Sequence, residues 1–233
     1  MELFYVNPEG VNGQTAVLDD FERRHMVQTL RKKTGDLVNL TDGNGHHLIG
    51  TISQTTPRLV VQIEQKIKIP LPAAQITLAC GFIKQNRLDF ILEKGTELGV
   101  THFVFFKSRY ANYHSANQNR LIKVVRQALK QSLHFYLPRV TILKSFAEFL
   151  KFSEPFQFKL TAIDQTFPAI KQVVKNSQSN EWLIAIGPEG GFSKEEVADM
   201  LDQNFQGISL GSHRLRTETA ALSALAFVQQ YIQ

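Results

Sequence analysis

Residues 186–196 read IGPEGGFSKEE and residues 210–221 read LGSHRLRTETAA, and these two segments share the same order of features. Each begins at the end of an apolar run, passes through a turn that contains glycine, and leads into a stretch that favours a helix. In the first segment, Ser193 and Glu196 have the spacing of a capping box, which closes the start of a helix. In the second, Thr217 can cap a helix whose first turn carries Glu218. Strand, glycine turn and helix therefore follow one another twice.

The chain around these segments repeats the same alternation. Apolar runs typical of buried strands occur at residues 75–83, 102–108, 156–163, 181–187 and 207–211. Stretches with helical periodicity occur at residues 88–99, 119–133, 167–176, 193–204 and 217–232. This order predicts an α/β fold with a mostly parallel sheet and helices on both of its faces.

The N-terminal part has a different pattern. Strands are predicted at residues 3–6, 36–40, 46–52 and 58–69, and a helix at residues 21–33. Two prolines within residues 69–72 then predict an extended, stiff linker. We therefore predict two domains, a small β-rich domain at residues 1–69 and an α/β domain at residues 73–233.

The composition excludes several classes of protein. With 43% hydrophobic and 20% charged residues among 233, the chain is typical of soluble globular proteins. It has no run of about 18 apolar residues that could cross a membrane, and residues 1–10 lack the basic start and apolar core of a signal peptide. We therefore expect a cytoplasmic protein. Its single cysteine, Cys80, excludes an internal disulfide and a cysteine-cluster metal site, so no metal is expected.

The two glycine turns are candidates for ligand binding. Open α/β sheets bind their ligands at the carboxyl ends of the strands, and glycine lets a ligand approach the backbone there. The sequence matches neither a Walker loop nor a Rossmann fingerprint, so the common nucleotide motifs are excluded. Two such turns in succession suggest a shared pocket whose main-chain groups bind a ligand, and plain turns are the alternative.

A basic tract lies in the middle of the chain. No aspartate or glutamate occurs between Glu97 and Glu148. At about 100° per residue, four cations of this tract share one side of a predicted helix, as contacts to nucleic-acid phosphates require. A solvated helix face is the alternative. With a second cluster near the N-terminus, the candidate RNA-binding residues are Arg23, Arg24, Arg31, Arg109, Arg120, Lys123, Arg126 and Lys130.

The predicted C-terminal helix at residues 217–232 is apolar on nearly all sides. A helix that packs against one surface has one apolar stripe, so this pattern indicates a second covered face. That face could meet a second copy of the chain in a homodimer, or it could be buried within the chain.

Together the two C-terminal segments resemble the paired motifs of the RsmE family, SPOUT-class methyltransferases that act on N3 of a uridine in 16S (small-subunit) ribosomal RNA. Residues 93–100 (EKGTELGV) and 128–138 (ALKQSLHFYLP) resemble two further family segments, and His25, Leu30 and Arg31 a third. The resemblance implies a PUA-like RNA-binding domain followed by a SPOUT domain with a C-terminal trefoil knot. It also implies a homodimer with the active site at its interface.

The cofactor that the resemblance implies is S-adenosyl-L-methionine, held bent by the knot. Two glycine loops and the turn after an earlier strand, placed here near Leu160 and Thr161, form this site in the family. The cofactor-binding residues carried over are Leu160, Thr161, Gly187, Pro188, Gly190, Gly191, Leu210, Gly211, Leu215, Arg216, Thr217 and Thr219. The chain departs from the family pattern at Ser212, His213, Lys130, His134 and Tyr136, which concerns contacts to RNA.

The implied reaction needs a group that removes or shares the proton on uracil N3, because the protonated nitrogen is a poor nucleophile. Glu189 and Glu218 are the carboxylates of the two loops, and Arg216 could stabilise the uracil anion. These three are the candidate catalytic residues. The partner expected is small-subunit ribosomal RNA or the assembled subunit. Alternatives are a SPOUT methyltransferase for another RNA nucleotide and a non-catalytic RNA-binding protein of the ribosome.

Overall fold

The computed structural model describes residues 1–175 and 179–232, and the chain divides into two compact units. The first unit contains Met1–Leu71 and Arg126–Leu137, and the second contains Pro72–Val125 and Pro138–Gln233. The predicted linker at residues 69–72 spans the first boundary. The sequence did not predict that Arg126–Leu137 joins the N-terminal residues. The nature of the first unit as a PUA-like domain stays a prediction.

The first unit is built around a six-stranded sheet with the order β1-β4-β5-β6-β3-β2. Only β1 and β4 pair in parallel, and the other neighbouring pairs are antiparallel. Buried aliphatic side chains such as Leu40, Leu48 and Val61 form its core. The strands are β1 (Leu3–Tyr5), β2 (Val11–Asn12), β3 (Thr15–Leu18), β4 (Leu37–Thr41), β5 (His46–Gln54) and β6 (Leu59–Lys68).

The helix predicted at residues 21–33 is shorter in the structure. It consists of α1 (Asp20–Arg24) followed by a π-helical segment, His25–Thr29. The Asp19 carboxylate accepts a hydrogen bond from the Glu22 N–H and caps the helix start. Arg31 has a φ of 56°, which is incompatible with a continuing right-handed helix. A 3-10 turn, Pro8–Gly10, precedes β2.

The second unit contains a parallel six-stranded sheet with the order β12-β10-β11-β7-β8-β9. This confirms the predicted α/β fold with a parallel sheet. Strand β9 was not predicted, because it lies at the sheet edge and is only partly buried. The strands are β7 (Gln75–Gly81), β8 (His102–Phe106), β9 (Arg139–Leu143), β10 (Phe158–Ala162), β11 (Glu181–Ile186) and β12 (Gln206–Ile208).

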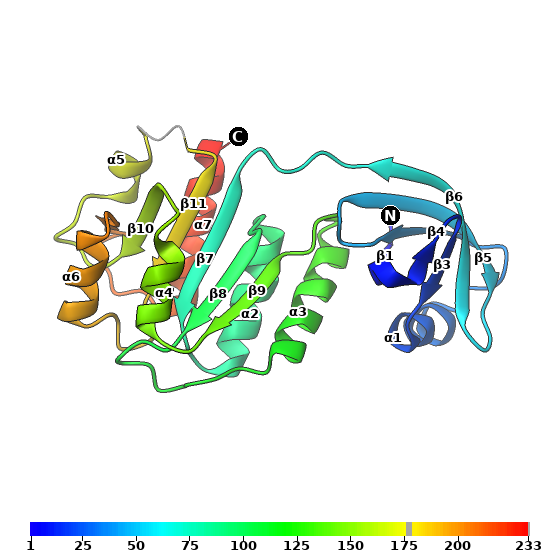
Figure 1. Cartoon of the computed structure of the whole chain (residues 1–233), viewed down its shortest axis with the longest axis horizontal. Helices are drawn as coiled ribbons and strands as arrows, with labels where there is room; N and C mark the ends of the chain where they lie inside the picture. Colours follow the sequence, from blue (N-terminus) through cyan, green and yellow to red (C-terminus); the bar gives the residue numbers. More distant parts are fainter. Residues whose placement is uncertain (176–178, 233) are drawn as a thin grey trace. The chain divides into compact units, whose positions relative to one another are not determined.

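Helices cover both faces of this sheet (Figure 1). On one face, Phe149 of α4 and Met200 of α6 pack against Phe106 of the sheet, and the Phe106 and Phe149 rings stack at 4.2 Å. Helices α2 and α7 contact each other, and α7 also contacts β11. The bounds are α2 (Gln85–Glu97), α3 (Gln118–Gln131), α4 (Phe146–Ser153), α5 (Ile170–Val174), α6 (Lys194–Asp202) and α7 (Thr217–Ile232).

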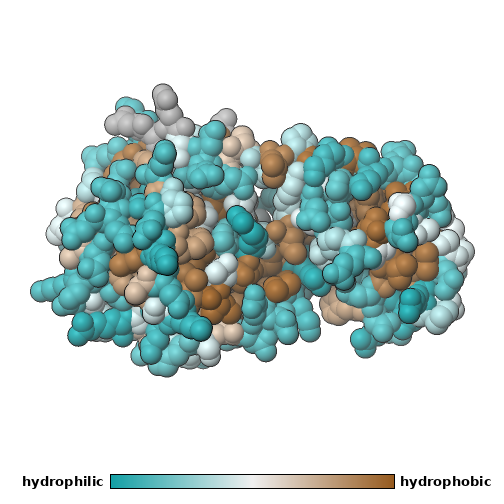
Figure 2. Space-filling view, in the orientation of Figure 1, coloured by the Kyte–Doolittle hydropathy of each residue, from teal (hydrophilic) through white to brown (hydrophobic). Residues whose placement is uncertain are grey.

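Two helices of this unit differ from the expectation drawn from the sequence. The one at residues 167–176 is reduced to α5, and its predicted last residue, Asn176, lies outside the described residues. Helix α4 was not predicted at all, although Ser145 caps its first turn by accepting a hydrogen bond from the Glu148 N–H. Among the residues that the structure describes, no helix is long and apolar enough to cross a membrane, and the visible surface of the protein is mostly hydrophilic (Figure 2).

Candidate functional site

A cavity of about 880 Å³ opens at the carboxyl ends of three adjacent strands of the second unit. The loops that follow β10, β11 and β12 form its walls, at residues 162–165, 186–192 and 208–217. These strands are neighbours in the order β12-β10-β11, so loops that are distant in sequence meet at one edge of the sheet. This is the edge at which open parallel sheets bind ligands.

Most residues predicted to bind the cofactor line this cavity. They are Gly187, Pro188, Gly190, Gly191, Leu210, Gly211, Leu215, Arg216 and Thr217. Leu160 and Thr161 do not, because both are fully buried inside β10, which continues to Ala162. The turn predicted near these two residues therefore begins later, and residues 162–165 line the cavity in their place. Thr219 is exposed in the first turn of α7 and is also not part of the lining.

The loop after β12 depends on Gly211. Its φ of 136° lies in a region that residues with a side chain rarely adopt, and a Cβ built there meets no atom within 4 Å. The Ser209 hydroxyl bonds to this residue twice, because it accepts a hydrogen bond from the Gly211 N–H and donates one to the Gly211 carbonyl. The open space beside Gly211 belongs to the cavity wall, so a bound molecule can approach the backbone there.

Arg87 of α2 joins the two candidate carboxylates. Its Nη1 lies 3.2 Å from Oε1 of Glu189, and its Nε lies 3.7 Å from Oε1 of Glu218. Oε2 of each glutamate is buried and has no hydrogen-bond partner among the described residues. Burial raises the pKa of the nearby Cys80 thiol, and Glu189 and Glu218 add to this shift. Cys80 is thus held as a neutral thiol.

Sequence reasoning missed Arg87, which lies 102 residues before Glu189. It lines the cavity although it belongs to a helix that begins after a different strand, β7. Its position in the first turn of the helix after β7 could have indicated this, because all parallel strands of one sheet end at the same edge and the helices that follow them begin there.

The two arginines of the loop after β12 differ in their contacts. The Nη2 of Arg214 donates a hydrogen bond to the Glu189 carbonyl at 3.2 Å. Arg216 is exposed on the cavity wall, and its guanidinium has no hydrogen bond or ion pair with any residue that the structure describes. Arg216 is therefore the guanidinium of this loop that is free to meet a negative charge in the cavity.

Asp164, in the loop after β10, is a second lining residue that the sequence did not indicate. Its Oδ1 accepts hydrogen bonds from the Thr166 N–H at 2.8 Å and from the Thr166 hydroxyl at 2.5 Å. These bonds fix the carboxylate and hold the pKa of Asp164 below its usual value. Oδ2 has no hydrogen-bond partner among the residues that the structure describes, so it can accept hydrogen bonds from a ligand. The spacing Asp-x-Thr after a strand, typical of an Asx turn, was the signal for this residue.

Comparison with known proteins agrees with this geometry. A family model described as an RNA methyltransferase domain matches residues 70–229. The chain is 30% identical over 230 residues to the ribosomal RNA small subunit methyltransferase E of Rickettsia conorii, covering 97% of this chain and 93% of that protein. The chain belongs to the ribosomal RNA small subunit methyltransferase E family.

Two further members of the methyltransferase E family extend the comparison. The Bacillus subtilis protein is 27% identical over 224 residues, which cover 89% of this chain and 86% of that protein. The structure of the Neisseria gonorrhoeae protein, bound to S-adenosyl methionine, has a TM-score of 0.84 with 27% identity, covering 99% of this chain and 97% of that chain. The family resemblance predicted from the sequence motifs is thus confirmed.

The cations predicted to bind RNA differ in their hydrogen bonds and ion pairs. Three form exposed ion pairs, Arg23 with Asp20, Arg109 with Glu195 and Arg120 with Asp89. Arg24 donates a hydrogen bond from Nε to the Asp20 carbonyl. Lys123 and Arg31 have no side-chain hydrogen bond or ion pair with the residues that the structure describes.

Arg126 and Lys130 are instead held inside the first unit. Lys130 Nζ lies 2.5 Å from Oε1 of Glu22, whose side chain is only 4% exposed. Arg126 donates a hydrogen bond to Asn7 at 3.1 Å, and its guanidinium lies 4.5 Å from the centre of the Tyr5 ring. The phosphate contacts predicted for both residues stay a prediction, and they would have to replace these contacts, which for the buried Lys130 carries a large penalty.

Proposed function

We propose that this chain transfers the methyl group of S-adenosylmethionine to N3 of a uridine in small-subunit ribosomal RNA. The observation that carries the proposal is the cavity formed by the two glycine loops and the loop after β10. Family membership supports it, and so does the S-adenosyl methionine bound by the Neisseria gonorrhoeae relative. The three loops around the cavity would form the trefoil knot. The test is to map modified nucleotides in ribosomal RNA from cells that lack the gene and from cells that carry it again.

The residues present fit this cofactor. A volume of about 880 Å³ is within the range of pockets for molecules of this size. Main-chain groups of the loops can recognise an adenine without charged side chains. The free Oδ2 of Asp164 can accept hydrogen bonds from ribose hydroxyls, as acidic residues do in other nucleotide sites.

Asp164→Ala should weaken S-adenosylmethionine binding by about 10- to 100-fold, since a charged acceptor of hydrogen bonds is lost. Asp164 is exposed, so the fold should be unaffected. Isothermal titration calorimetry measures the change, with Asp199→Ala, another exposed aspartate, as the control. A cofactor analogue without the ribose 2′-hydroxyl should bind the unmodified protein and Asp164→Ala with the same affinity. An unchanged affinity for the natural cofactor in Asp164→Ala would contradict the assignment.

The chain's own residues would prepare the uracil for reaction. S-adenosylmethionine supplies an electrophilic methyl group, and the protein must make N3 nucleophilic. Glu189 or Glu218, the carboxylates of the two loops, would take the N3 proton, while Arg87 holds both side chains in place. Arg216 would stabilise the negative charge that develops on the uracil.

RNA would bind to the cations that remain available. Lys123 and Arg31 are the first candidates, and Arg23, Arg24, Arg109 and Arg120 could exchange their surface partners for phosphates at small cost. The first unit would act as the PUA-like RNA-binding domain. The partner would be small-subunit ribosomal RNA or the assembled subunit, in the cytoplasm.

The C-terminal helix supports a homodimer. Leu225 and Val228 are fully buried by other residues of this chain, so they are not available to contact a second copy. The adjoining side of α7 carries the stacked pair Phe227 and Tyr231, with Tyr231 46% exposed, and no charged residue follows Glu218 in the helix. A surface helix without charges is unusual in contact with water, and a second copy would cover it.

Phe227→Glu should convert the dimer to a monomer, because a charge buried at the interface raises the dissociation constant by more than about 100-fold. Light scattering at micromolar concentration measures the mass. Leu201→Glu on α6 is the control, since Leu201 is an exposed apolar residue outside α7. A monomeric unmodified protein, or a dimer that persists in Phe227→Glu, would refute this interface.

A further inference from the structure

The segment at residues 107–117, between β8 and α3, contains two exposed tyrosines. Tyr110 is 49% exposed and Tyr113 is 40% exposed. The segment leaves the sheet at the carboxyl end of β8, which is the edge that carries the cavity loops. Keeping an aromatic ring in water forfeits the stabilisation that its burial would provide. An exposed ring at this edge therefore needs a reason.

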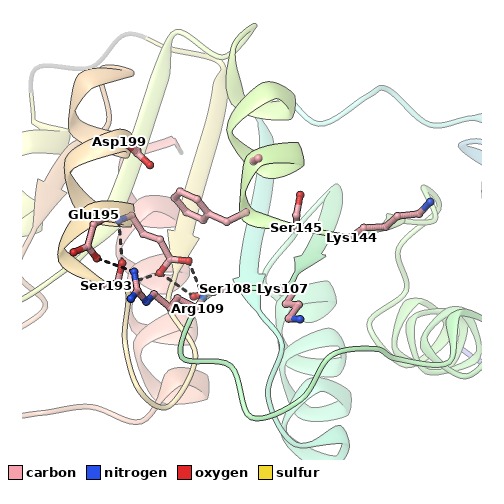
Figure 3. A pocket seen from close by; sticks show the side chains of 11 residues that line it. Lys107, Ser108, Arg109, Lys144, Ser145, Ser193, Glu195 and Asp199 are labelled. Atoms are coloured by element: carbon pink, nitrogen blue, oxygen red, sulfur yellow. Dashed lines mark hydrogen bonds and ion pairs between the residues drawn. The ribbon is translucent and has the colours of Figure 1, made fainter.

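Glu196 clamps the start of the segment. Its Oε2 accepts a hydrogen bond from the Ser108 hydroxyl at 3.1 Å, and its Oε1 accepts one from the Arg109 N–H at 2.8 Å. Glu196 also closes the capping box with Ser193 directly after the glycine loop. Figure 3 shows Ser108 and Arg109 beside Ser193 at the start of α6, with dashed lines for these contacts. The backbone next to Tyr110 is thus fixed to the element that follows the cavity loop.

Tyr110 also contacts the cavity loop directly. A Cβ built on Gly190 would lie 2.7 Å from the Tyr110 Cβ and 3.1 Å from the Tyr110 carbonyl oxygen. Gly190 is therefore required by the packing of Tyr110, a different reason from the ligand approach that the sequence indicated. Because Gly190 lines the cavity, Tyr110 packs against the cavity loop while about half of the residue stays exposed to solvent.

We infer that Tyr110 is the surface on which the target uracil stacks during methyl transfer. Enzymes that modify a base must take it out of its stack, and aromatic side chains then hold the unstacked base. The exposed cations Lys107 and Arg109 precede Tyr110 in the same segment and can contact the adjoining phosphates. This inference rests on the proposed function, and it adds the residue that positions the base.

Tyr113 provides a matched control. It is an exposed tyrosine of the same segment, three residues further on, and none of its atoms is among those nearest to a Cβ built on a glycine of the cavity. Tyr110→Ala should lower kcat/KM for methylation of small subunits purified from cells without the enzyme by about 10- to 100-fold, the usual effect of losing one base-stacking ring. Tyr110→Phe should restore the rate, since stacking needs no hydroxyl, and Tyr113→Ala should stay within about two-fold.

Two further measurements separate stacking from a structural role. S-adenosylmethionine affinity should be unchanged in Tyr110→Ala, because the ring does not line the cofactor cavity. Small-subunit ribosomal RNA transcribed with 5-iodouridine should cross-link under long-wavelength light to the peptide that contains Tyr110, because iodouracil reacts with a stacked aromatic ring.

The outcomes are distinct. Full activity in Tyr110→Ala, failure of Tyr110→Phe to restore the rate, or loss of cofactor affinity parallel to the loss of activity would each overturn the stacking role while leaving the proposed function intact. If the unmodified protein binds S-adenosylmethionine but methylates neither subunits nor RNA, the proposed function fails first and the stacking role fails with it.

Discussion

Lys130→Met is expected to lower the free energy of unfolding of the first unit by about 3–5 kcal/mol, because the change leaves a buried carboxylate without its counter-charge. The Glu22 side chain is 4% exposed and the Lys130 side chain 13% exposed. Oε2 of Glu22 has no hydrogen-bond partner among the described residues. The ion pair between Oε1 and Lys130 is therefore the contact that offsets the cost of burying this carboxylate. Lys130 comes from α3, and its loss would release that segment from α1.

The same pair gives the loss a pH dependence. Burial raises the pKa of Glu22, and Lys130 opposes this shift. A carboxyl group whose pKa is higher in the folded state binds more protons there, so its contribution to stability falls as the pH rises from its unfolded towards its folded pKa. Without Lys130 the folded pKa rises further. The stability deficit of Lys130→Met should therefore be smaller at pH 5 than at pH 8.

The measurement must report on the first unit. Trp182, the only tryptophan, belongs to the second unit, so its fluorescence is unsuitable. Hydrogen exchange of the β4–β6 amides at increasing urea follows the first unit instead. Gln127→Met, also on α3 and in the first unit but exposed, should change stability by less than about 0.5 kcal/mol. Glu22→Gln added to Lys130→Met should recover part of the loss. A deficit below about 1 kcal/mol at pH 8 would contradict the ion pair.

The basic helix shows where reading a sequence locally fails. Periodicity placed Arg120, Lys123, Arg126 and Lys130 on one side of α3, and no acidic residue lies nearby in the chain. The structure brings Glu22 to Lys130 across 108 residues and Asn7 to Arg126 across 119. Helical spacing indicates which side chains share a face, but partners that arrive through tertiary packing leave no local signal.

The cavity was more accessible to sequence reasoning. Both glycine loops follow apolar strands and end in helix starts, which are local features, and Ser193 and Glu196 form the predicted capping box. Arg87 and Asp164 were not predicted as cavity residues. The sequence around each of them does not show that the preceding strand ends beside the glycine loops. Strand order decides this, and the alternation of strands and helices predicts a parallel sheet without predicting which strands are neighbours.

Edge elements were also missed, for an energetic reason. Strand β9 is only partly buried, so its sequence need not alternate or be uniformly apolar. Helix α4 follows it directly and presents several aromatic side chains to the core, among them Phe146 and Phe149. An aromatic-rich stretch favours strand and helix almost equally when it is short. The interior strands β7, β8 and β11 gave a clear signal because both of their faces are covered.

Arg216→Ala should slow methyl transfer by about 100- to 1,000-fold, the range found when one group that stabilises a developing negative charge is removed. Arg216 lines the cavity, is exposed and has no partner among the described residues, so its charge is available to the substrate. The change should affect S-adenosylmethionine affinity by less than about three-fold, because the cofactor carries positive charge at the reacting sulfur.

Single-turnover methylation at saturating cofactor measures this effect, and Arg214→Ala is the matched control. Arg214 lies two residues away but donates to the Glu189 carbonyl, so its loss should slow the reaction by less than about ten-fold. A cation near the uracil favours loss of the N3 proton, so the rate of Arg216→Ala should reach its plateau at a higher pH than that of the unmodified protein. Equal losses in the two variants, or an unshifted pH profile, would assign Arg216 to holding the loop and leave the uracil anion to be stabilised by backbone N–H groups at the cavity.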